Sequence, residues 1–290
     1  MLVSVAAATA AAVAVGATLL QSRGDSDLQL RDGDPPLVLD LGARQDAEAR
    51  ELLRAEQLYE DGDKRAAARI FARYRSLDAR VGLALASWPE GTLDRLEQLA
   101  AEAPRDGVVR LNLGFVLFWS GRPEEAVEAW RAVRRIDPDS LAAVRAGDLL
   151  FPQFARGLPI FVPGSPAGEA GVHLLAGVRF QRLGRQLSAR REFDEAVRLA
   201  PNDPEPLVAA AVARFDKANP SAAFARLGPL ARRFPRAPTV RFHLGLLLLW
   251  LGRVDDARTQ LERARAADPD DPLAREANRF LERLESVENS

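Results

Sequence analysis

Apolar residues recur at helical spacing along most of this chain, and the breaks between the helical stretches are regular. From Asp46 onward the apolar positions follow a period near 3.6 residues. The breaks return at a fixed interval, so that Pro201, Pro235 and Pro269 are each 34 residues apart. The pattern predicts an all-α protein built from repeated pairs of helices.

Small residues stand at fixed places in each regular copy. A glycine lies seven residues before a second glycine, an alanine follows five residues later, and a large apolar residue follows after four more. The first glycine lets two helices approach closely, the second allows a left-handed turn, and the proline ends the unit. The glycine pairs are Gly114 and Gly121, Gly177 and Gly184, and Gly245 and Gly252, while a copy without them keeps the spacing with Ala223, Leu227 and Pro235.

This arrangement resembles the tetratricopeptide-repeat (TPR) family, whose unit is a helix–turn–helix of 34 residues. The run from Arg110 to Gly114, the run from Gly121 to Ala126 and the pair Asp137-Pro138 are close to the family's pattern. The resemblance covers roughly residues 48 to 286. It implies a right-handed α-solenoid whose first helices line a concave groove that binds proteins or peptides.

The boundaries of the units follow from these landmarks. We expect a solenoid over residues 45–290, in which a final amphipathic helix at 272–286 caps the array. The expected units are about 48–76, a shortened one at 79–103 broken at Pro89-Glu90-Gly91, then 107–140, an irregular 141–169, and 170–203, 204–237 and 238–271.

Residues 141–169 depart from the pattern. Leu141 to Leu150 can form a first helix, but the stretch that follows is too rich in proline and glycine to form a second one. It is also too apolar for a solvated loop, since it carries Phe154, Ile160 and Phe161. Either it packs down to fill the gap left by the missing helix, or it is a lid or arm, around residues 151–163, that covers the groove or grips a partner.

The first 20 residues form a separate apolar segment. Leu2 to Leu20 carries no charge and is long enough to cross a membrane, so it predicts a transmembrane anchor or a cleaved secretory signal. A buried alanine-rich helix is the alternative. Residues 21–44 have the composition of a linker, in which Leu37 to Leu39 could add a short extended piece. The acidic flank after the apolar run favours a solenoid outside the cytoplasm, membrane-anchored or secreted.

Candidate chemistry is scarce in this sequence. A net charge of -1 provides no field that would attract nucleic acid, and there is no cysteine. His173 and His243 are isolated, so each is expected to be a buried or rim residue rather than a metal ligand. We therefore expect a non-enzymatic protein with no cofactor and no metal, which binds a protein or peptide and contacts a membrane through its N-terminal segment.

The resemblance to the TPR family also indicates which residues would line the groove. They are mostly apolar, so the leading hypothesis is a scaffold that binds an apolar peptide or protein segment. The alternative is a purely structural subunit of a cell-envelope complex, with a groove filled by its own irregular segment. The candidate groove residues are Leu111, Phe115, Phe118, Trp119, Leu174, Val178, Gln181, Arg182, Val208, Val212, Phe215, Phe242, Leu246, Leu249 and Trp250.

Overall fold

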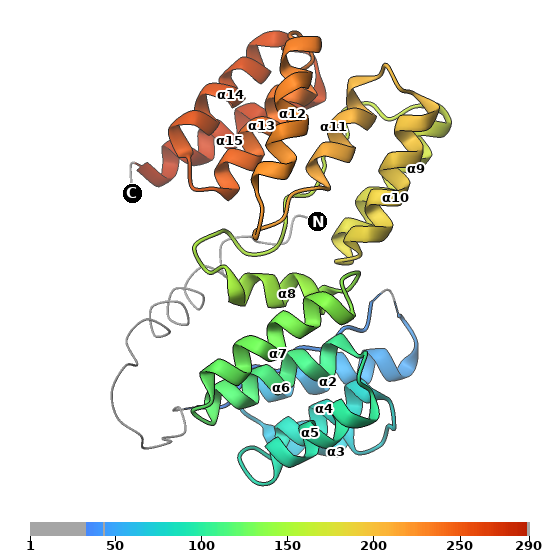
Figure 1. The fold of residues 1–290 in the computed structure, drawn as a ribbon, viewed down its shortest axis with the longest axis vertical. Coiled ribbons are helices and arrows are strands. Elements are labelled where there is room, and N and C mark those ends of the chain that lie inside the picture. The colour runs from blue at the N-terminus through green and yellow to red at the C-terminus, as the bar shows by residue number, and fades with distance from the viewer. Residues whose placement is uncertain (1–32, 43, 289–290) are drawn as a thin grey trace. The chain divides into compact units, whose positions relative to one another are not determined.

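The computed structural model describes residues 33–42 and 44–288, and every regular element within them is an α-helix (Figure 1). The all-α prediction is therefore confirmed for this part of the chain. The chain divides into two compact units, one ending at Pro152 and the other beginning at Gln153. Among the described residues, no helix is both long and apolar enough to cross a membrane. The predicted anchor or signal at 1–20 lies outside the described residues.

Unit 1 consists of three helix pairs and a single closing helix. The first helices of the pairs, α2, α4 and α6, pack side by side, and α8 packs next to α6. The pairs are α2 (Ala47–Glu60) with α3 (Lys64–Phe71), α4 (Leu77–Ala86) with α5 (Thr92–Glu102), and α6 (Gly107–Trp119) with α7 (Pro123–Ile136), followed by α8 (Leu141–Leu150).

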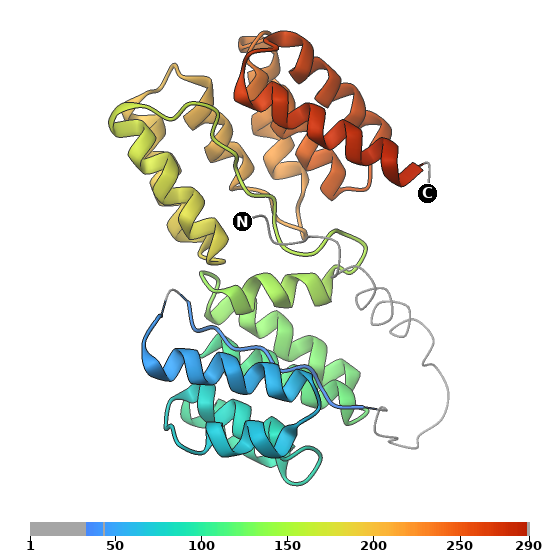
Figure 2. The ribbon, with the colours of Figure 1, turned by 180° about the vertical axis from the view of Figure 1, so that it is seen from behind.

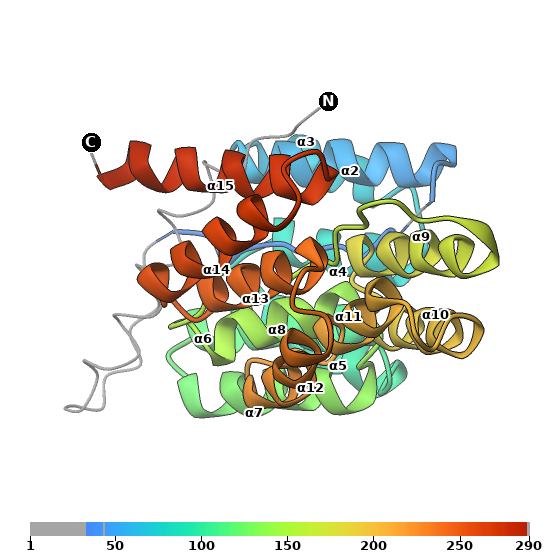
Figure 3. The same ribbon diagram turned by 90° about the horizontal axis from the view of Figure 1, so that it is seen from above.

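Unit 2 repeats this plan. Its first helices α9, α11 and α13 are neighbours, and the closing helix α15 packs on α13 and α14. The α9–α10 pair is seen with its helices side by side in Figure 3. The pairs are α9 (Gly168–Arg182) with α10 (Gln186–Leu199), α11 (Pro204–Val212) with α12 (Ser221–Arg233), and α13 (Pro238–Trp250) with α14 (Val254–Ala267), followed by α15 (Pro272–Glu288).

The glycines of the repeat do what their spacing predicts. At Gly114 in α6, an added Cβ would lie 2.2 Å from Nε1 of Trp130 in α7, so only glycine lets these helices pack at this separation. Gly121, between the two helices, has φ of 73°, the left-handed region that favours glycine. The same pair of roles falls to the matching glycines of α9–α10 and α13–α14.

The structure differs from the predicted single array in two places. The helix expected at 141–150 is present as α8, but it closes unit 1 instead of opening an irregular fourth unit. The proline-rich residues after it belong to unit 2. Residues 34–41, placed in a linker by their composition, are packed into unit 1, because Leu37, Leu39 and Leu41 alternate with more exposed residues and are buried.

Candidate functional site

An extended segment precedes the first helix of unit 1 and lies across its first helices. We call residues 34–41 strap 1; it is the blue segment before α2 in Figure 2. Every second residue from Pro35 to Leu41 is buried, as expected when one face of an extended chain is covered. The first helices of unit 1 and α8 thus form a face, here the first-helix face, that is already occupied by the chain itself.

Polar side chains of the first helices bind the backbone of strap 1. Asn112 of α6 accepts from the N–H of Val38 at 3.1 Å and donates to its carbonyl oxygen at 2.7 Å. The Tyr59 hydroxyl of α2 donates to the carbonyl oxygen of Pro35 at 2.7 Å. The N–H groups of Leu39 and Asp40 donate to carboxylates, as described below. Backbone groups that would be unpaired when buried are therefore satisfied.

Unit 2 has an equivalent extended segment before α9, and its first helices α9, α11 and α13 form the first-helix face of that unit. We call residues 155–165 strap 2; it is the yellow-green segment leading to α9 in Figure 2. The N–H of Val162 donates to Nε2 of His243 in α13 at 3.0 Å. Gln181 of α9 accepts from the N–H of Phe161 at 2.9 Å and donates to the carbonyl oxygen of Pro159 at 3.4 Å. After α11, Lys217 donates to the carbonyl oxygen of Ala155 at 2.5 Å.

Three anchoring contacts recur at equivalent places in the two units. Each strap has a proline followed three residues later by a valine, at Pro35 and Val38 and at Pro159 and Val162. In both straps a helix side chain binds the carbonyl oxygen of the proline, and another accepts from the N–H of the valine. The third contact is a carboxylate on the second residue of the second pair's first helix. Asp78 of α4 accepts from the N–H of Asp40 at 3.3 Å, and Glu205 of α11 accepts from the N–H of Gly164.

A fourth contact is present in unit 1, and unit 2 lacks both its hydrogen-bond donor and its acceptor. In unit 1 the N–H of Leu39 donates to the carboxylate of Glu56 in α2 at 3.2 Å. In unit 2 the residue after the valine is Pro163, which has no N–H. Glu56 lies three positions before Tyr59, and the residue three positions before Gln181 in α9 is Val178. The residue that corresponds to Glu56 is therefore apolar. Donor and acceptor are thus replaced together.

Burial beneath the straps shifts the pKa values of the carboxylates that hold them. Burial raises the pKa of Glu56 to about 7, with the Leu39 N–H acting in the opposite direction. Burial likewise raises the pKa of Asp78 to about 6, helped by Asp106 and Asp40. In unit 2, burial raises the pKa of Glu205 above its ordinary value. Burial therefore favours the neutral form of each carboxylate over the charged form.

His243 is held as a neutral acceptor. Its Nδ1 lies 2.7 Å from the carbonyl oxygen of Thr239, which requires the proton on Nδ1, so Nε2 is left to accept from Val162. The side chain is fully buried, and burial lowers the pKa of His243 to about 4. The ring of Phe161 stacks on it with centroids 4.8 Å apart and meets Phe193 edge-on at 5.8 Å. The expectation that His243 is a buried residue is confirmed.

The residues predicted to line the groove are mainly interior residues. Gln181 is the member of the set with a hydrogen bond to a strap. Trp119, Leu249 and Trp250 are half-buried and Arg182 is exposed. Binding of a partner by these residues stays a prediction. The buried members are Leu111, Phe115, Phe118, Leu174, Val178, Gln181, Val208, Val212, Phe215, Phe242 and Leu246.

Most strap-binding residues were not among those predicted. Glu56, Tyr59 and Asp78 lie in the first two helix pairs, for which no groove residues were derived. Asn112 and His243 each stand two residues before the first glycine of their repeat, and this shared place is the signal that could have identified them.

Trp119 and Trp250 end α6 and α13 and occupy the same place in their repeats. Within the described residues, the indole Nε1 of each is buried without a hydrogen-bond partner. Both side chains therefore contribute packing and no polar contact inside their units. This likeness makes them a matched pair for comparing the two units.

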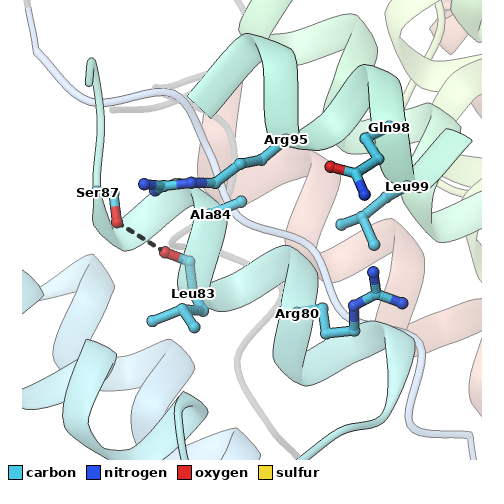
Figure 4. Close-up of a pocket in the computed structure, with 7 residues that line it drawn as sticks. All are labelled: Arg80, Leu83, Ala84, Ser87, Arg95, Gln98 and Leu99. Atoms are coloured by element: carbon cyan, nitrogen blue, oxygen red, sulfur yellow. Dashed lines mark hydrogen bonds between the residues drawn. The ribbon is translucent and has the colours of Figure 1, made fainter. Parts of the chain in front are cut away.

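A shallow pocket of about 440 Å³ lies on the α4–α5 pair of unit 1 (Figure 4). Arg80 and Leu83 of α4 face Arg95 and Gln98 of α5 across it. Arg80 is paired with Glu102 at 2.6 Å, and the Ser87 hydroxyl donates to the Leu83 carbonyl oxygen. Arg80, Gln98 and Ser87 are therefore engaged in contacts within the α4–α5 pair.

Comparison with protein families finds the tetratricopeptide repeat at residues 89–147 and 215–278. Both matches begin just before the second helix of the second pair or at the turn leading to it, and both end inside the closing helix, α8 or α15. The family pattern therefore recurs at the same place in each unit. A comparison with the sequences of curated proteins finds no match.

Several solved structures of repeat proteins are similar to this chain. A thermophilic TPR protein of Thermus thermophilus is 19% identical, covers 81% of this chain and 99% of its own, with a TM-score of 0.28. Yeast Tom70 is 16% identical over 82% of this chain and 48% of its own, with a TM-score of 0.28. The Cut9-Hcn1 hetero-tetramer of the APC/C is 15% identical over 82% of this chain and 55% of its own, with a TM-score of 0.29. At these scores, the family assignment rests on the repeats themselves.

Proposed function

Because this chain is a tetratricopeptide-repeat protein, we propose that it is a protein-interaction scaffold in which each first-helix face is a peptide-binding site occupied by the chain's own strap. TPR arrays generally mediate contacts between proteins, and extended faces of such repeats are their usual binding surfaces. Binding of a partner segment then requires that a strap leave its face.

The observation that carries this proposal is the set of three recurring contacts to strap backbone. Tyr59 or Gln181, Asn112 or His243, and Asp78 or Glu205 bind peptide groups of an extended chain. Peptide-binding sites work in this way, because main-chain hydrogen bonds provide affinity for any extended segment and apolar contacts provide selectivity. A strap competes from an effective concentration on the order of millimolar, since it is tethered to its face.

A second candidate is a structural scaffold whose straps never leave. The burial of Leu37 and Phe161 favours it, because such side chains each contribute ~1.5–3 kcal/mol when buried. In that case the partners would contact other surfaces, and the straps would be part of the core. The two candidates differ in one measurable property, which is whether a strap opens while the helices beneath it stay folded.

Hydrogen exchange followed by mass spectrometry separates these candidates. For the first, the amides of residues 34–41 and 155–165 exchange faster than those of α6 and α13, because local opening needs less free energy than global unfolding. Equal exchange free energies for straps and helices would support the structural scaffold and contradict strap opening.

We also propose that the two units lie outside the cytoplasm. The support is the charge-free run from Leu2 to Leu20 and the acidic residues that follow it. Cell fractionation with protease treatment from outside the cell tests this proposal. Recovery of the intact chain in the cytosol would contradict it.

A further inference from the structure

We infer that the two first-helix faces bind segments of other proteins with the pattern Pro-x-Leu/Phe-Val, and that the residue after the valine decides which unit is bound. A segment with proline at that position enters unit 2, and a segment with a free N–H there enters unit 1. This inference rests on the proposed function, because it names the ligand of the same sites.

The straps show what each face accepts at three positions. The proline has its carbonyl oxygen bonded by Tyr59 or Gln181 and has no N–H to leave unpaired. Its ring also favours the extended conformation that the face requires. The valine is bonded through its N–H to Asn112 or His243.

The residue before the valine supplies the main apolar contact. Phe161 is fully buried between His243 and Phe193, and Leu37 is buried in the core of unit 1. A large apolar side chain is therefore required here. Unit 2 favours an aromatic residue at this position, because His243 offers a ring to stack on and Phe193 a ring to meet edge-on.

The position after the valine distinguishes the two units. In unit 1 the N–H of Leu39 satisfies the buried carboxylate of Glu56. In unit 2 the matching strap residue is Pro163, and the matching helix residue is the apolar Val178. A peptide N–H placed there lacks this acceptor, and a proline placed in unit 1 leaves Glu56 without its donor. Either mismatch is expected to lower affinity about tenfold.

The test uses the full chain with strap 2 released by the double substitution Phe161→Ala and Val162→Pro, which removes the buried ring and the N–H that His243 accepts. Two labelled peptides serve as probes, PIFVPG from residues 159–164 and PPLVLD from residues 35–40. Fluorescence anisotropy should show that the released variant binds PIFVPG about tenfold more tightly than PPLVLD. A PIFVPG peptide with N-methylvaline keeps every side chain but lacks the valine N–H, so it should bind at least tenfold more weakly.

The mirror variant, Leu37→Ala with Val38→Pro, should reverse the preference and bind PPLVLD more tightly. It also serves if the first variant fails to fold by circular dichroism. If neither folds, millimolar PIFVPG added to the unmodified chain should speed hydrogen exchange in residues 155–165, and N-methylated PIFVPG should not.

Absence of peptide binding, or equal binding of the N-methylated peptide, would overturn the inference. Dimers that form in the released variant and dissolve on adding peptide would also overturn it, since the occupant would then be the strap of a second copy. Strap opening in the unmodified chain is measured separately by its exchange rate, so a failure of peptide selectivity is distinguishable from a failure of the proposed function.

Discussion

Unit 1 holds the N–H of Val38 with the side-chain amide of Asn112, whereas unit 2 holds the N–H of Val162 with the imidazole of His243. Each unit has three helix pairs, a closing helix and a strap in the same place, yet every anchoring residue differs in type between the two units. The comparison indicates that the positions of the strap's backbone groups are fixed by the fold. The side chain that meets each group can vary, provided that no buried donor or acceptor is left alone.

The largest expected effect tests whether the two units share their close helix contacts. Gly114→Ala and Gly177→Ala should each lower the free energy of unfolding by ~3 kcal/mol or more, because the added Cβ would lie 2.2 Å from Trp130 and 2.3 Å from Phe193. Gly245→Ala should cost less, ~1 kcal/mol, since the nearest atom belongs to Leu261 at 2.9 Å. Urea denaturation of each variant measures these differences.

The matched control is Gly147→Ala in α8, where no atom beyond the neighbouring residues of the chain lies within 4 Å of the added Cβ. Removing a mid-helix glycine should stabilise the protein by up to ~1 kcal/mol. A cost at Gly114 no larger than the effect at Gly147 would contradict close packing of α6 on α7.

The next effect is a difference between the units in how the stability of each strap depends on pH. The folded pKa of His243, about 4, lies below its unfolded value of 6.5, so this group stabilises strap 2 fully above pH 6.5 and loses that contribution as the pH falls toward 4. Between pH 7 and pH 5 the loss should be ~2 kcal/mol. Hydrogen exchange of residues 155–165, corrected for the intrinsic rate, should report it.

Strap 1 should respond in the opposite direction. The pKa values of Glu56 and Asp78 are raised by burial, so their effect favours the closed strap at low pH and weakens it as the pH rises from about 4 toward 7. Glu205 acts in this same sense within unit 2, against His243. The variant His243→Asn, which copies Asn112, should remove the acid-induced opening of strap 2. Persistence of that opening in His243→Asn would assign it to another group.

A smaller effect tests the paired replacement at the fourth contact. Pro163→Leu and Val178→Glu should each destabilise unit 2, the first by adding an unpaired N–H and the second by burying a carboxylate without a donor. Together they recreate the contact between Leu39 and Glu56, so a double-mutant cycle should give a favourable coupling of ~1 kcal/mol. Additive costs would mean that the two positions do not meet.

The smallest effect concerns the matched tryptophans. Trp119→Phe and Trp250→Phe should each change the free energy of unfolding by less than ~1 kcal/mol, because the lost packing is offset by removal of a buried N–H without a partner in the described structure. Thermal melts of both variants should move by similar amounts. A large loss in only one of them would show that the likeness between Trp119 and Trp250 does not extend to their energetic roles.

Much of the helical fold could be predicted from sequence, because its signals are local and repeated. Gly121, Gly184 and Gly252 locate the turns between paired helices, and the break at Pro89-Glu90-Gly91 separates α4 from α5 as predicted. These residues act through their own backbone conformation. Their meaning therefore does not depend on distant parts of the chain.

The straps could be predicted only in part, because their meaning depends on residues far along the chain. Leu37 to Leu39 suggested a short extended piece. Residues 151–163 suggested either a segment that fills the gap left by a missing helix or a lid over the groove. Eight extended residues give too little periodicity to show which face they occupy. The anchors Asn112 and His243 lie 74 and 81 residues from their bonded valines, so helical spacing carried no sign of the contact.

The order in which the chain is made gives the straps a further consequence. Each strap precedes its helices, so it leaves the ribosome before the surface that will cover it exists. At roughly 5–20 residues per second, the 74 residues between Val38 and Asn112 require several seconds of synthesis. During that interval the face beneath strap 1 is incomplete, because α2 and α4 have been made but α6 has not. Newborn chains therefore pass through a period in which strap and face are both open to other proteins, before either unit closes on itself.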